Sequence, residues 1–225
     1  MKKKVWVSHS GGKDSMLALH RVLEREDIEV AALLTTITDS FERSTTHGIR
    51  EELVELQAEQ LGIPLHKVFL PEDPTNKNYN QRISDAYQAA KDEGVTHIVF
   101  GDILLKDVRD YRENQVKEAG LEAIFPLWGE PTNQLIHEFI ELGYETIITT
   151  IDPKIVPQSF LGEKITVDLL ERLPSDIDVC GENGEFHTFV VNGPRFKEPL
   201  PYQVSDHKHE GPFYTYIDIV RSETT

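Results

Sequence analysis

The stretch that decides the fold is Ser10-Gly11-Gly12-Lys13-Asp14-Ser15, near the start of a 225-residue chain. It follows the apolar run Val5-Trp6-Val7 and opens a segment, Met16 to Leu23, in which apolar residues keep helical spacing. A strand, a glycine turn and a helix N-terminus in this order form an anion site, because free N–H groups and the helix dipole favour negative charge there. The glycines let the backbone approach a phosphate, and Lys13 adds a positive charge. The stretch therefore predicts a phosphate-binding loop.

The remaining side chains of this loop fit the same interpretation. Ser10 and Ser15 supply hydroxyl donors, and Asp14 supplies a carboxylate that can hold Mg²⁺. The alternative is a structural glycine turn with Ser10 as helix cap. The loop is not of the Walker A type, which requires glycine at position 7 and serine or threonine at position 14, where this chain has Val7 and Asp14. We favour the phosphate site because all six residues occur between a strand and a helix.

The amino-acid composition indicates which binding partners and which cellular compartment to expect. The formal net charge of −16 repels a phosphate backbone, so we do not expect nucleic acid as a partner. Cys180 is the only cysteine, which excludes an intrachain disulfide and paired-cysteine metal chemistry. No apolar run approaches the ~18 residues of a membrane span, and we expect a cytoplasmic protein without membrane contact. The sequence is compatible with a homodimer.

Strand-like and helix-like runs alternate over the first part of the chain, with strands expected near 5–8, 30–36, 65–70 and 97–100. This alternation predicts an α/β fold with an open, parallel, Rossmann-like sheet and helices on both faces. Beyond Trp128 the chain has many prolines and short mixed segments. We predict a nucleotide-binding domain over residues 1–128 and a smaller α+β domain over residues 129–225.

Ligands of such a sheet bind beyond the carboxyl ends of the strands, where the strand order reverses. The phosphate loop, His47 and the pair Gly101-Asp102 all follow predicted strands, and we expect them to bind a nucleotide. Each has a structural alternative: His47 can flank a helix start, and Gly101 can simply end a strand.

Two arginines follow the last of these strands. Arg109 and Arg112 share one helix face at three-residue spacing. They can clamp phosphates, or they can pair with Asp107 and Glu113 as solvated helix charges.

The second half contains one unusual stretch, Gly181-Glu182-Asn183-Gly184-Glu185-Phe186-His187-Thr188. From pattern alone it is a hairpin turn with Asn183-Gly184 at the tip, leading into a strand near residues 189–191.

Several blocks of the chain together resemble the diphthine–ammonia ligase family of N-type ATP pyrophosphatases. They are SGGKDS at 10–15, His47-Gly48, Gly101-Asp102-Ile103, Pro126-Leu127-Trp128 and GENGEFHTF at 181–189. The resemblance covers nearly the whole chain and implies an ATP-binding domain of the ATP pyrophosphatase (HUP) type. It replaces the hairpin interpretation, because it implies that the acidic stretch belongs to the substrate site.

The resemblance also implies a reaction. A substrate carboxylate attacks the α-phosphate of Mg·ATP, giving an acyl-adenylate and pyrophosphate, and ammonia then displaces AMP to form an amide. Lys13 and Asp14 are the expected catalytic residues at the phosphates, with Asp14 as metal ligand. Glu182 and Glu185 are the expected catalytic residues near ammonia or the trimethylammonium group of diphthine on elongation factor 2.

One block departs from the family pattern. Diphthamide-linked members typically carry Ser-x-Tyr-Gln after the Gly-x-Ile segment, where this chain has residues 104–113, LLKDVRDYRE. The alternatives are therefore an AMP-forming ligase that acts on a different carboxylate or amine, and a non-catalytic ATP-binding sensor.

Overall fold

The structure is a computed structural model that describes residues 2–38, 43–44, 48–71 and 75–222. Packing divides the chain into two compact units. The first comprises Met1–Ser10, Asp14–Thr45 and Ile63–Gly129, and the second comprises Gly11–Lys13, Thr46–Gly62 and Glu130–Thr225. The sequence-based division at residue 128 stays a prediction. Packing differs from it in one respect, because two short segments of the first part group with the second unit.

The first unit is built on a mainly parallel sheet. Its parallel strands are β1 (Lys3–Ser8), β2 (Ile28–Thr38), β4 (Leu65–Leu70), β5 (His97–Val99) and β6 (Glu122–Ile124), and β3 (Arg43–Ser44) pairs antiparallel with β2. The parallel pairs are β4 with β2, β2 with β1, β1 with β5, and β5 with β6. Chain order reverses at β1, so the switch point lies between β1 and β5, where open α/β sheets bind ligands. The predicted Rossmann-like α/β fold is confirmed.

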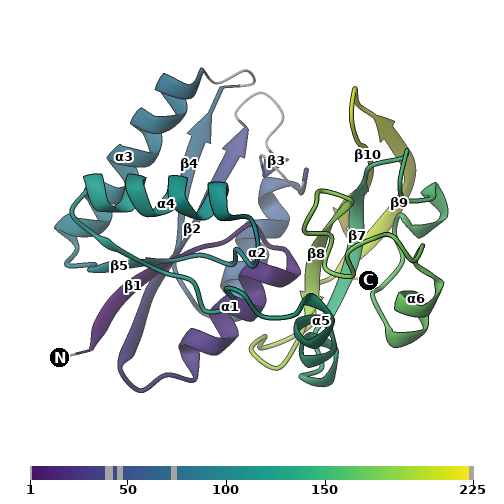
Figure 1. The fold of residues 1–225 in the computed structure, drawn as a ribbon, viewed down its shortest axis with the longest axis horizontal. Helices are drawn as coiled ribbons and strands as arrows, with labels where there is room; N and C mark the ends of the chain where they lie inside the picture. The colour runs from purple at the N-terminus through teal and green to yellow at the C-terminus, as the bar shows by residue number, and fades with distance from the viewer. Residues whose placement is uncertain (1, 39–42, 45–47, 72–74, 223–225) are drawn as a thin grey trace. The chain divides into compact units, whose positions relative to one another are not determined.

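Helices cover both faces of this sheet. In Figure 1, α3 (Asn76–Asp92) and α4 (Lys106–Glu118) lie on one side and α1 (Lys13–Leu23) on the other. Side chains alternate along each strand, so Trp6 of β1 faces α3 and α4 and packs in one cluster with Tyr87 and Val116. The cluster is buried, and its burial raises the pKa of the Tyr87 hydroxyl well above the ordinary value.

The second unit contains a four-stranded antiparallel sheet in the order β8-β7-β10-β9. The strands are β7 (Glu145–Ile151), β8 (Phe186–Asn192), β9 (Tyr202–Glu210) and β10 (Thr215–Arg221). Its helical elements are α2 (Glu51–Leu61), α5 (Thr132–Glu141), the 3₁₀ turn η1 (Gln158–Phe160) and α6 (Val167–Arg172). This mixture of strands and helices confirms the predicted α+β class.

One ion pair fixes the start of α2 to the sheet of the second unit. Arg50 precedes α2, and its Nη2 lies 2.6 Å from an oxygen of the Asp218 carboxylate on β10. Asp218 is buried, and the charge-assisted hydrogen bond raises the pKa of the Arg50 guanidinium. No helix within the described part of the chain is long and apolar enough to cross a membrane.

Candidate functional site

The loop after β1 has the strand–turn–helix geometry that the sequence predicts. β1 ends at Ser8, and α1 begins at Lys13. Gly11 has φ +85°, a backbone conformation that side chains disfavour, and a Cβ there would lie 3.1 Å from the Phe189 ring. Beside the helix start, the hydroxyl oxygens of Ser10 and Ser15 lie 3.3 Å apart. The helix N-terminus and two hydroxyls thus make a surface suited to phosphate.

Within the second unit, residues 11–13 of this loop are hydrogen-bonded to β8. The Val190 N–H donates to the Gly11 carbonyl at 2.9 Å. The Lys13 N–H donates to Thr188 Oγ1 at 3.1 Å. Two motifs that lie far apart in the sequence, SGGKDS and GENGEFHTF, are therefore in direct contact.

Gln57 completes this junction. It lies on α2 with no exposed surface, and its Nε2 donates to the Gly11 carbonyl at 3.1 Å and to the Val190 carbonyl at 2.6 Å. A buried amide that bridges two backbone oxygens fixes both segments, because leaving its buried Nε2 donor unpaired would carry a desolvation penalty. Sequence reasoning missed Gln57, because it belongs to no local pattern that signals a role. It included Thr188 in the GENGEFHTF block but gave that residue no role of its own.

The side chain of Lys13 points into the second unit. Only 3% of Lys13 is exposed, its Nζ donates to the Cys180 carbonyl, and the same Nζ lies 5.7 Å from the centre of the Phe186 ring. The predicted contact of Lys13 with phosphate stays a prediction. In this structure the ammonium group instead joins the phosphate loop to the turn that carries the acidic motif.

That turn is organised by two carboxylates, those of Asp178 and Glu185. Glu185 is 3% exposed, and it accepts hydrogen bonds from the Asp178 N–H at 3.0 Å and from the N–H and side-chain amide of Asn183 at 2.8 and 3.0 Å. Asp178 in turn accepts from the N–H groups of Cys180 and Glu182 at 2.9 and 3.2 Å. The geometry gives Glu185 a role in holding the turn, whereas Glu182 is only half-buried.

The hairpin interpretation of this stretch is wrong. The turn does lead into β8, but β8 pairs with β7, which lies much earlier in the chain. Gly181 and Gly184 have φ values of +73° and +86°, so the turn needs glycine at both positions. Asp178 was not predicted, although an aspartate whose side chain accepts from the N–H two residues later is a common turn device.

Gly101 and Asp102 lie in the first unit, at the end of β5. A Cβ on Gly101 would come within 2.8 Å of the Asp14 carbonyl carbon and 2.9 Å of the Ser15 nitrogen. Glycine is therefore required for β5 to end against the first turn of α1. Asp102 is mostly buried and lies 2.9 Å from Nε of Arg112. The expected site residues Asp14, Ser15, Gly101 and Asp102 are thus brought together.

The predicted metal and histidine positions remain predictions. Asp14 lies in the first turn of α1, half-buried, and His47 lies outside the described residues. Within the described ranges, no group of three or more histidine, cysteine, aspartate or glutamate side chains could hold a metal ion. One carboxylate together with substrate phosphates is, however, a common arrangement for Mg²⁺, so the residues present fit that ion.

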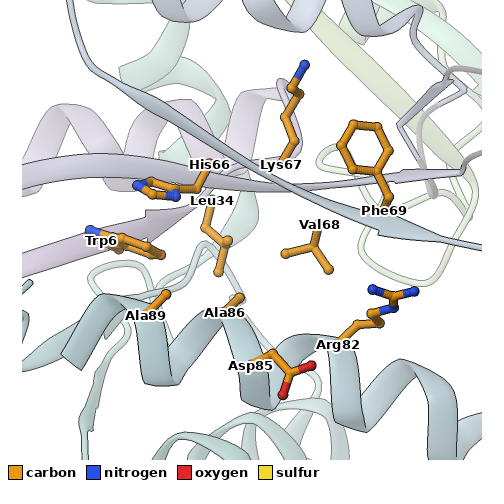
Figure 2. A pocket seen from close by; sticks show the side chains of 10 residues that line it. All are labelled: Trp6, Leu34, His66, Lys67, Val68, Phe69, Arg82, Asp85, Ala86 and Ala89. Atoms are coloured by element: carbon orange, nitrogen blue, oxygen red, sulfur yellow. The ribbon is translucent and has the colours of Figure 1, made fainter. Parts of the chain in front are cut away.

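A separate cavity of about 290 Å³ opens between β4 and α3. Figure 2 shows it lined by Trp6, Leu34, His66, Lys67, Val68, Phe69, Arg82, Asp85, Ala86 and Ala89. The rings of Trp6 and His66 stack there with centroids 4.0 Å apart. None of the predicted site residues lines this cavity.

The fold and the loop at its switch point define a Rossmann-like nucleotide-binding protein. The model of the diphthamide synthase N-terminal domain matches residues 3–123, and that of the diphthamide synthase C-terminal domain matches residues 131–223. The chain therefore belongs to the diphthamide synthase family, and it is an ATP-dependent ligase of this amide-forming family.

Relatives named diphthine–ammonia ligase are similar over most of the chain. The rat protein is 26% identical over 219 residues, covering 88% of this chain and 82% of the relative. The human protein is 25% identical, covering 85% and 79%. The Schizosaccharomyces pombe protein is 24% identical, covering 85% of this chain but only 34% of its own greater length.

Two solved structures are more distant. One is a predicted subunit of a tRNA methyltransferase from Methanocaldococcus jannaschii, 18% identical, with a TM-score of 0.39 over 62% of this chain and 75% of that one. The other is a U34-tRNA thiolase from Methanococcus maripaludis, 19% identical, with a TM-score of 0.36 over 63% and 57%.

Proposed function

We propose that this enzyme activates a substrate carboxylate with ATP and converts it into an amide with ammonia, as a diphthine–ammonia ligase does. The observation that carries the proposal, beside family membership, is the hydrogen-bonded junction of residues 11–13 with β8 and the acidic turn. It joins the segment suited to phosphate to the segment that the resemblance assigns to the substrate.

The phosphate chemistry falls to the loop. N–H groups at the start of α1, the hydroxyls of Ser10 and Ser15, and the ammonium of Lys13 would stabilise the charge on the phosphates. For Lys13 this requires Nζ to exchange the Cys180 carbonyl for a phosphate oxygen. Asp14 would hold Mg²⁺ with ATP oxygens, and the ion would supply charge neutralisation.

The proposed reaction has two steps. A carboxylate oxygen of the substrate bonds to the α-phosphorus of ATP, and pyrophosphate leaves. The nitrogen of ammonia then bonds to the activated carbonyl carbon, AMP leaves, and a base takes the proton that nitrogen loses. Glu182 is the better candidate for that base and for a cation site, because the Glu185 carboxylate is committed to the turn.

We propose diphthine as the substrate, since the relatives are named diphthine–ammonia ligase. The resemblance implies that this diphthine is carried by elongation factor 2. Residues 104–113 differ from the family's Ser-x-Tyr-Gln pattern, so the alternative is a ligase that acts on another small carboxylate or amine. We further propose that the enzyme is cytoplasmic and acts without nucleic-acid or membrane partners. A homodimer is compatible with this proposal.

The test supplies the enzyme with Mg·ATP, ammonium and diphthine-bearing elongation factor 2 whose substrate carboxylate is labelled with ¹⁸O. The expected products are an amide, pyrophosphate, and AMP that carries one ¹⁸O atom. Release of ADP and phosphate contradicts the proposal. Tight ATP binding without pyrophosphate release, over a panel of carboxylates, supports the sensor instead.

A further inference from the structure

Within the part of the chain that the structure describes, two arginines on α4 contact carboxylates only through the Nε edge of their guanidinium groups. Arg109 Nε lies 2.8 Å from Glu113 Oε1, and Arg112 Nε lies 2.9 Å from Asp102 Oδ2. The sequence left two interpretations open for these arginines. For Arg109 the helix pair with Glu113 is observed, but Arg112 reaches off its helix to the end of β5.

Both guanidinium planes also contact aromatic rings. The Arg109 Cζ lies 5.0 Å from the Phe125 ring centre and 4.6 Å from that of Trp128. The Arg112 Cζ lies 4.9 Å from the Phe100 ring centre. Phe100 and Phe125 themselves stack, with centroids 5.4 Å apart. Such contacts orient both guanidinium groups in advance, so less side-chain freedom is lost when a ligand binds.

The opposite edges of both groups remain available. Among the described residues, no hydrogen bond or ion pair engages an Nη atom of Arg109 or Arg112. The two side chains are 31% and 32% exposed, so part of each one is accessible to a ligand. Two neighbouring guanidinium groups with fixed planes and open Nη atoms match the geometry of a carboxylate or phosphate group.

The pair is linked to the start of α1 through Asp102 and to the rest of that helix through Arg21. Asp102, which holds Arg112, follows the glycine that packs against Asp14 and Ser15. Arg21 of α1 donates through Nη1 to the Pro126 carbonyl at 3.0 Å, which fixes the segment that carries the two rings under Arg109. All these contacts lie within the first unit.

We propose that Arg109 and Arg112 form an oxyanion-binding pair that takes a phosphate or carboxylate group through their Nη atoms. The identity of the ligand rests on the proposed function, which offers two sources of that chemistry. One is the pyrophosphate end of ATP, and the other is a carboxylate of the amide-ligase substrate.

The first measurement is calorimetric titration of the enzyme with inorganic pyrophosphate and Mg²⁺, which needs no turnover. Arg109→Gln and Arg112→Gln are each expected to weaken binding by about tenfold or more. The matched control is Lys117→Gln, which removes one positive charge from an exposed position on the same helix. It is expected to bind as the unchanged protein does.

The second measurement is the apparent KM for the carboxylate substrate in the amide assay. Weaker pyrophosphate binding assigns the pair to phosphate, and unchanged pyrophosphate binding with a raised KM assigns it to the carboxylate. If pyrophosphate affinity and the apparent KM are both unchanged in variants that unfold at the normal temperature, the proposed oxyanion-binding role of Arg109 and Arg112 is refuted. Arg112→Lys keeps the charge but loses the fork, so full affinity in that variant contradicts bidentate contact.

The two proposals fail in different ways. An enzyme that binds pyrophosphate through the pair but makes no amide refutes the ligase proposal alone. An enzyme that makes the amide, with both arginine variants behaving as the unchanged protein, refutes the pair alone. If Arg109→Gln fails to fold because its ring contacts are lost, Arg112→Gln and Arg112→Lys still decide the question.

Discussion

At the scale of single residues, Lys13 combines a structural and a proposed chemical role. Its ammonium group is buried and donates to the Cys180 carbonyl. We expect Lys13→Ala to lower AMP formation by about 10² or more, because one preorganised donor at a developing charge contributes that much. Loss of the buried hydrogen bond from Lys13 Nζ to the Cys180 carbonyl should also lower the free energy of unfolding by about 1–3 kcal/mol.

Pyrophosphate release and urea unfolding measure these two effects of Lys13→Ala separately. Lys117→Ala, an exposed change on α4, serves as the control and should alter neither. Retained AMP formation in Lys13→Ala would show that the phosphate loop is misassigned.

Glu185 provides a second prediction at this scale. In Glu185→Gln an NH₂ group replaces one of two oxygens that both accept from N–H donors. We expect the free energy of unfolding to fall by about 1–3 kcal/mol and amide formation to drop, while ATP binding persists.

Equilibrium ATP titration and the amide assay test this prediction. Glu171→Gln, an exposed position on α6, is the matched control. Unchanged turnover in Glu185→Gln would leave the acidic turn with a structural role only.

At the scale of elements, the end of β5 depends on Gly101. A methyl group there meets the backbone of α1, which cannot move aside as a flexible side chain can. We expect Gly101→Ala to destabilise the protein by about 1–3 kcal/mol and to weaken ATP binding, because the first turn of α1 must shift.

Gly94→Ala separates this steric effect from backbone strain. Gly94 has φ +80° and open space around it, so its substitution should cost about 1 kcal/mol through backbone strain and leave ATP affinity unchanged. Urea unfolding and ATP titration of both variants make the comparison. Equal ATP affinities would contradict the role of Gly101.

His97 of β5 makes stability depend on pH. Burial, and secondarily the charge of Lys3, lower its pKa below the ordinary value near 6.5. The folded state therefore disfavours the protonated form, and the stability contributed by neutral His97 is present above pH 6.5 and lost as pH falls through the lowered pKa. The free energy of unfolding should decline less on acidification in His97→Gln than in the unchanged protein.

Some elements could be predicted from sequence and others could not. The strand, turn and helix around residues 5–23 follow from a local pattern. β6 was not predicted because it has only three residues and none is fully buried. β9 was not predicted because it lies at the sheet edge and most of its side chains are exposed, so its residues carry no apolar alternation. Gln57 resembles a polar position on any helix, and its role exists only through contacts with residues 46 and 133 positions away.

At the scale of the whole molecule, the formal net charge is −16. Mutual repulsion of surface carboxylates opposes the compact state, and added salt screens it. We expect the unfolding temperature to rise by about 2–4 °C between low and moderate sodium chloride, which corresponds to about 1 kcal/mol for a chain of this size. Scanning calorimetry over a salt series measures it, and a falling midpoint would contradict it.

The attachment of residues 11–13 to β8 has a consequence for how this protein can be divided or recombined. A fragment that stops at residue 129 keeps the SGGKDS sequence but loses Thr188 and Val190, the partners of its backbone. Exchanging the C-terminal half between relatives therefore also exchanges residues that support the predicted phosphate loop. Chimeras that preserve every residue of the motif should still differ in how tightly they hold ATP.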